Sequence, residues 1–136
     1  MSTALLILCL LADLSSIKSE PNLEKRSGMA LDYAASEVDA ARDSYNSGDL
    51  AKYREALEQI RSAVELSYQS LQDTGRSARK DKHFKHAELR TRELLRRLDG
   101  LRDEVNFDDR AALDTVRTRV SEVHDQLLQG IMSKKK

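Results

Sequence analysis

Apolar residues recur at steps of three and four over residues 50–71, and polar residues fill the positions between them. The apolar positions, with Ser67 as the one polar residue in their series, are Leu50, Tyr53, Leu57, Ile60, Val64 and Leu71. This spacing predicts a helix with one apolar stripe along its length. Such a helix depends on partners that cover the stripe, so the rest of the chain should supply them.

Three further stretches of the chain repeat this rhythm. Their apolar positions, in chain order, are Leu31, Ala34, Val38, Ala41 and Tyr45; Phe84, Ala87, Leu94, Leu98, Leu101 and Val105; and Leu113, Val116, Val120, Val123 and Leu127. Four such seams on helices of roughly 22 to 26 residues are typical of an up-down-up-down bundle. The sequence therefore predicts an all-α, four-helix bundle with coiled-coil-like seams.

Short polar segments mark the expected ends of these helices. Gly48 suits the left-handed position after a helix, and Asp49 can cap the helix that follows. Gly75 should end the second long helix. Residues 106–109 interrupt the third seam, where either a new helix begins or one bent helix continues through this point. The first link is so short that the first two long helices should form an antiparallel hairpin.

The N-terminal segment resembles a secretory signal peptide. Residues 4–12 are nine consecutive apolar residues, and the small pair Ser15-Ser16 follows shortly. A membrane-spanning helix needs about 20 apolar residues, whereas the apolar region of a signal peptide is shorter. We expect residues 1–18 to be a signal peptide and residues 19–136 a single periplasmic or secreted domain. Because no basic residue precedes the run and no A-x-A motif follows it, a buried N-terminal helix of a cytosolic protein is the alternative.

Composition restricts the chemistry that the mature domain can perform. The only cysteine, Cys9, lies in the expected signal peptide, which leaves the domain without disulfides or thiolates. Aromatic residues make up 4% of the chain, and neither a G-x-S-x-G motif nor a glycine-rich phosphate loop is present. Basic and acidic residues balance at 23 each, so no net charge draws the chain to nucleic acid. We expect a protein that is not an enzyme and carries no cofactor.

The distribution of charge is the feature most relevant to function. Residues 76–97 contain nine basic and three acidic residues, whereas residues 99–114 contain six acidic and two basic residues. The predicted interaction face consists of Arg79, Lys82, Lys85, Arg90, Arg92 and Arg97. It would bind an acidic protein or an anionic envelope surface. The simpler interpretation, which the charge pattern alone favours, is a solvated helix whose charges pair with acidic residues of neighbouring helices. The chain would then act as a binding module, monomeric or weakly self-associating.

Three histidines define the alternative function, a metal- or haem-carrying bundle. His83 and His86 stand three residues apart with Glu88 nearby, a spacing that can hold a transition ion. Three lysines around them make the local field positive, so we expect a solvated face there and no metal. His124 should lie at the edge of the core. Together with Met29, it resembles the haem ligands of small exported b-type cytochromes, a resemblance that implies a haem-binding bundle.

One short segment resembles a repeat protein. The stretch YNSGDLAKYREAL, residues 45–57, is similar to the turn between the two helices of a tetratricopeptide unit. It occurs once, and repeat architectures need about three units. The resemblance implies a helical hairpin at this position.

Overall fold

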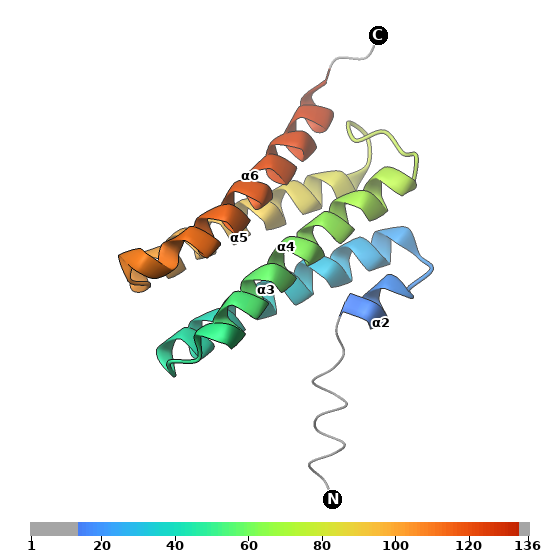
Figure 1. Ribbon diagram of the computed structural model, residues 1–136. Coiled ribbons are helices and arrows are strands. Elements are labelled where there is room, and N and C mark those ends of the chain that lie inside the picture. The colour runs from blue at the N-terminus through green and yellow to red at the C-terminus, as the bar shows by residue number, and fades with distance from the viewer. Residues whose placement is uncertain (1–13, 134–136) are drawn as a thin grey trace, which may run out of the picture.

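The computed structural model describes residues 14–133, and the regular structure in this part of the chain is entirely helical. Its elements are α2 (Leu14–Lys18), α3 (Leu23–Asn46), α4 (Leu50–Asp73), α5 (Lys82–Glu104), the 3-10 turn η1 (Phe107–Asp109) and α6 (Arg110–Met132). The four long helices pack together, each antiparallel to the next in the chain (Figure 1). This confirms the predicted all-α class. The apolar run at 4–12 lies outside the described residues, and none of the described helices is apolar enough over a sufficient length to cross a membrane.

The four long helices form two hairpins that pack against each other. Helix α3 pairs with α4 and α5 pairs with α6, while contacts of α4 with α6 and of α3 with α5 close the bundle. The first hairpin turns as predicted, since Gly48 has a φ of 82° and the Asp49 side chain accepts a hydrogen bond from Lys52 N at 3.1 Å. Gly75, at a φ of 68°, follows the end of α4 in the same way.

Helices α5 and α6 are separated by a distinct turn, which rules out one bent helix through residues 105–110. Val105 has an extended backbone, with φ −98° and ψ 139°, and the turn η1 follows it. Tyr45 of α3 secures this turn because its hydroxyl donates to Asp109 Oδ2 at 3.0 Å and accepts from Asn106 N at 2.9 Å. Phe107 stays 82% exposed at the tip.

The core follows the predicted seams, with a few differences. Every predicted seam residue of α5 and α6 is buried, but Leu50 at the start of α4 is 36% exposed. Ser67, the one polar residue in the predicted stripe of residues 50–71, is buried, and so are Ser27 and Ser70. The hydroxyls of Ser27 and Ser67 lie 2.8 Å apart, and Ser70 donates to the carbonyl of Leu66 at 2.7 Å. These bonds satisfy hydroxyls that would otherwise be costly to bury.

The short helix α2 packs against the first hairpin. Leu14 and Ile17 are buried against α3 and α4. Arg26 ties the end of α2 to the bundle, since its Nη1 donates to the Lys18 carbonyl at 3.3 Å and its Nε donates to Ser70 Oγ at 2.9 Å. Residues 14–18 are thus part of the packed structure, although the domain was predicted to begin at residue 19.

Candidate interaction surface

The structure divides the six residues of the predicted interaction face into two groups. Three of them, Arg90, Arg92 and Arg97, form ion pairs with carboxylates of the bundle. The side chains of the other three, Arg79, Lys82 and Lys85, are exposed and form no hydrogen bond or ion pair within residues 14–133. The side chain of the neighbouring Lys80, which was not placed on the predicted face, is also exposed and without such a partner in this part of the chain. We refer to Arg79, Lys80, Lys82 and Lys85 as the unpaired cations.

Two of the paired arginines connect α5 to α3. Arg90 Nη2 lies 2.7 Å from Asp32 Oδ1, and Arg97 Nη2 lies 2.6 Å from Asp39 Oδ1. Arg97 also donates to the carbonyl of Ala35 at 3.2 Å. Arg90 and Arg97 are seven residues apart on α5, and Asp32 and Asp39 are seven residues apart on α3. The same contact therefore repeats after two helical turns. These arginines therefore act as interhelical ties rather than as free positive charge.

Arg92 belongs to a charged cluster between α5 and α6. Its partner Glu88 is buried, and His124 of α6 approaches the same carboxylate, with Nε2 2.7 Å from Glu88 Oε2. Burial would raise the pKa of Glu88, but hydrogen bonds from His124 and Arg92 outweigh it and hold this pKa below its usual value. The His124 side chain is only 13% exposed, which confirms the predicted edge-of-core position. A haem iron could bind Nε2 only if the contact with Glu88 were broken.

The unpaired cations gather at the start of α5. Lys82 and Lys85 lie in its first turn, directly after the N-cap Asp81, whose side chain accepts a hydrogen bond from His83 N at 2.7 Å. The positive end of the helix dipole lies here, so each added cation is unfavourable by a few tenths of a kcal/mol. Residues 76–85, which we call the basic segment, contain five basic residues against Asp81 alone.

The histidines of α5 do not meet as the metal hypothesis required. The described residues contain one group with the atom types and spacing of metal ligands, formed by Glu24, Asp81 and His83, whose ligand atoms lie within 4.8 Å of one another. Arg76 already bridges the two carboxylates, at 3.1 Å from Glu24 Oε1 and 3.7 Å from Asp81 Oδ2. A guanidinium thus supplies the positive charge that an ion would bring. The cluster joins α3 to the start of α5, and His86 and Glu88 take no part in it.

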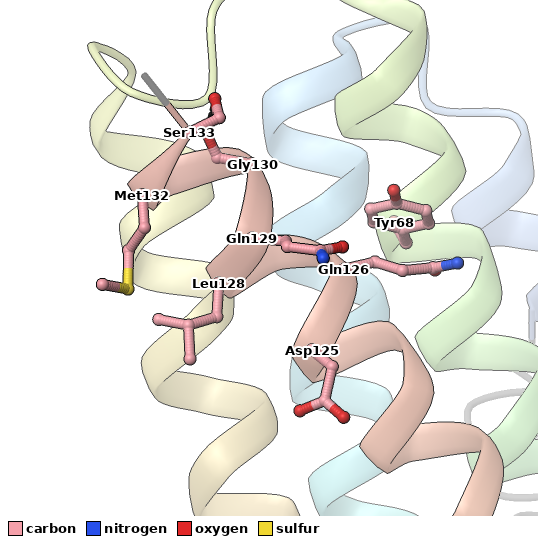
Figure 2. A pocket seen from close by; sticks show the side chains of 8 residues that line it. All are labelled: Tyr68, Asp125, Gln126, Leu128, Gln129, Gly130, Met132 and Ser133. Carbon is pink, nitrogen blue, oxygen red and sulfur yellow. Dashed lines mark hydrogen bonds between the residues drawn. The ribbon is translucent and has the colours of Figure 1, made fainter.

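A surface depression follows the last two turns of α6 (Figure 2). It is lined by Tyr68 of α4 and by Asp125, Gln126, Leu128, Gln129, Gly130, Met132 and Ser133. Figure 2 shows Leu128 and Met132 on one side of the helix and Tyr68 on the other. At Gly130 an added Cβ would lie 3.1 Å from Cβ of Ala78, so glycine permits the loop before α5 to approach α6 closely. The lining offers no nucleophile paired with a base, and we assign it no chemistry.

Sequence reasoning missed the buried Glu88 as a partner of His124. The signal was present, since Glu88 follows Phe84 by four residues and precedes Thr91 by three, which places it on the same helical face.

Comparisons with protein-family models, with curated proteins and with solved structures found no match. The function must therefore be argued from the arrangement of charge.

Proposed function

We propose that this protein is a non-catalytic interaction module whose basic segment binds an acidic surface of another protein molecule. The observation that carries the proposal is the absence of carboxylate partners for the four unpaired cations in the described chain, whereas Arg90, Arg92 and Arg97, which follow them along α5, are all paired. The helix dipole and mutual repulsion both disfavour such a cluster. A bound acidic partner would remove both penalties.

Exposure of cations near a helix start does not by itself indicate a binding surface. Lys52 and Arg54 are also exposed near the start of α4. Asp49, Glu55 and Glu58 surround them in the sequence, so the local charge is not positive there. The basic segment differs because its cations outnumber acids five to one. This contrast makes Lys52 and Arg54 a matched control for Lys82 and Lys85.

The chemistry of the unpaired cations indicates the kind of partner. Three of the four are lysines, which act as compact and strongly hydrated point charges and suit clusters of carboxylates. Binding of this kind is weakened by salt, because the charges are exposed and screened over about 8–10 Å at physiological ionic strength. An acidic protein surface satisfies the cations directly.

We also propose that the protein is exported. The support is the apolar run at 4–12, and α2 adds a constraint on processing, because Leu14 and Ile17 pack on α3 and α4. Cleavage on the N-terminal side of Leu14 would keep this packing. Intact mass of the protein isolated from outside the cytoplasm tests this. Retention of residues 1–13 on protein found only in the cytosol would exclude export.

Binding to immobilised poly-glutamate peptide tests the interaction proposal. We expect measurable, salt-sensitive binding by the wild type and at least about tenfold weaker binding by the Lys82→Gln/Lys85→Gln variant. The matched variant Lys52→Gln/Arg54→Gln removes the same charge and should bind as the wild type does. Equal weakening in both variants would mean that only net charge matters and would overturn the proposal. Retention on anionic lipid vesicles without binding to the peptide would point to a membrane partner and would also overturn it.

A further inference from the structure

The opposite end of α5 carries a complementary segment of negative charge. Residues 103–109, which we call the acidic turn, contain the four acidic residues Asp103, Glu104, Asp108 and Asp109 and no basic residue. The acidic turn and the basic segment lie at opposite ends of the bundle (Figure 1). The length of α5 separates them by roughly 33 Å, several times the screening length in physiological salt. The two segments therefore cannot neutralise each other within one molecule.

The acidic turn is held in place by tyrosines of the first hairpin. Tyr45 bonds to both Asn106 and Asp109, and the Tyr53 hydroxyl donates to the Asp109 carbonyl at 3.3 Å. Phe107 nevertheless points its ring into solvent, with 82% of the residue exposed. Because the tyrosines hold the turn, its backbone loses little conformational freedom on binding, and exposed aromatic side chains often anchor protein interfaces.

Both ends of α5 carry charges that oppose its dipole. Lys82 and Lys85 lie at the positive end, while Asp103 and Glu104 lie in the last turn at the negative end. Glu104 is paired with Arg42, whereas Asp103 and Asp108 are exposed and form no ion pair among residues 14–133. Contact between the end of one α5 and the start of another would align the two dipoles and place each charge cluster against its opposite.

We propose that the acidic turn of one copy of this chain binds the basic segment of a second copy, giving head-to-tail association. This inference rests on the proposed function and names its partner. Phe107 contacts the aliphatic stems and charged heads of the unpaired cations, through apolar contact and cation–π attraction. The contact is heterologous, since different surfaces of the two copies meet. The tip of a four-helix bundle offers a small area, so the association is weak and dissolves in high salt.

Two half-variants isolate a single interface. In the first, Lys80→Gln, Lys82→Gln and Lys85→Gln neutralise three of the four unpaired cations and leave the acidic turn intact. In the second, Asp103→Asn, Phe107→Ser and Asp108→Asn neutralise the two acidic residues of the turn that have no ion pair, remove its exposed aromatic ring, and leave the basic segment intact. Sedimentation velocity of each variant alone, and of an equimolar mixture, follows association from about 10 μM to about 1 mM. The variant Lys52→Gln/Arg54→Gln is the control, and circular dichroism confirms that each chain is helical.

The expected result is that the wild type and the control self-associate increasingly with concentration, whereas each half-variant alone remains monomeric. The mixture should form a one-to-one complex and nothing larger, because only one complementary pair of ends remains. Self-association that survives in either half-variant, or a mixture that stays monomeric, would overturn the inference. If the wild type stays monomeric but binds poly-glutamate, the head-to-tail inference fails and the proposed function stands. If it does neither, both fail.

Discussion

The pair formed by Glu88 and His124 should stabilise the bundle more than the neighbouring Arg92 does. Glu88 is 7% exposed, and its Oε2 lies 2.7 Å from His124 Nε2. A hydrogen bond to a charged group contributes about 1.5–3 kcal/mol. We therefore expect His124→Ala to lower the free energy of unfolding by about 2–3 kcal/mol. His124→Phe keeps a ring of similar size but removes the hydrogen bond. It should lower the free energy of unfolding nearly as much.

Arg92 provides the comparison because it contacts the same carboxylate from the solvent side. Its Nη2 also lies 2.7 Å from Glu88 Oε2, but its side chain is 62% exposed. Solvent screens this contact, and exposed pairs at this spacing contribute about 0.3–0.5 kcal/mol. Arg92→Ala should therefore lower the free energy of unfolding by about 0.5 kcal/mol, several times less than His124→Ala.

The dependence on pH provides a second check on the same pair. The pKa of Glu88 is lowered in the folded state, against the effect of its burial, by hydrogen bonds from His124 and Arg92. A carboxyl group with a lowered pKa stabilises the fold above its unfolded pKa, about 4.3 for glutamate, and this contribution is lost as the pH falls below that value. The difference between wild type and His124→Ala should therefore shrink between about pH 5 and pH 3.

Urea denaturation followed by circular dichroism, at pH 7 and in steps below it, measures both effects. The reasoning would be refuted if Arg92→Ala were as costly as His124→Ala at neutral pH. It would also be refuted if the effect of His124→Ala stayed constant down to about pH 3, because the charge on Glu88 would then not matter.

Three further predictions concern other parts of the bundle. Ile60→Ala should lower the free energy of unfolding by about 2–5 kcal/mol and Val120→Ala by somewhat less, since both residues are fully buried; urea denaturation measures both. Burial raises the pKa of Tyr53 to about 12, so Tyr53 should be the last tyrosine to ionise in an ultraviolet pH titration. The contribution of its neutral hydroxyl to the free energy of unfolding should be lost as the pH rises above about 10. A chain starting at residue 19 lacks Leu14 and Ile17, each of which contributes about 1.5–3 kcal/mol when buried. Its free energy of unfolding should therefore be lower than that of a chain starting at residue 14, by up to about 3–6 kcal/mol less the entropy of ordering α2.

Each of these predictions has a control. Glu58 is exposed, so Glu58→Ala should change the free energy of unfolding by less than about 0.5 kcal/mol. A larger effect than that of Ile60→Ala would contradict the core assignment. Tyr53→Phe should remove the late titration and leave the other tyrosines unchanged. If both truncated chains were equally stable, α2 would contribute nothing to the bundle.

The apolar seams were predictable because each depends on the period of a single helix. Phe84, Leu98 and Val120 lie on the buried faces that their spacing indicates. The turns were also predictable where local backbone chemistry decides, as at Gly48 and Gly75 with their positive φ angles. Helix α2 was not predicted, because five residues are too few to show a period.

The candidate surface was only partly predictable. The excess of cations in residues 76–97 is visible in the sequence, but the partners of Arg90 and Arg97 are not. Their ion pairs with Asp32 and Asp39 depend on how far α5 is shifted along α3, and no single helix contains that information. The same holds for Glu88, whose helical phase indicates burial but not contact with His124.

The separation of the cations of α5 into paired and unpaired groups is the central claim, and unfolding of two matched double variants in urea tests it most directly. Arg90→Gln/Arg97→Gln should lower the free energy of unfolding by about 0.5–2 kcal/mol, because two partly screened interhelical pairs are lost. Lys82→Gln/Lys85→Gln removes the same charge and should leave that free energy unchanged or slightly higher, because it relieves repulsion at the positive end of α5. If the lysine variant lost as much stability as the arginine variant, Lys82 and Lys85 would be internal partners, and the basic segment would have no charge to offer a second molecule.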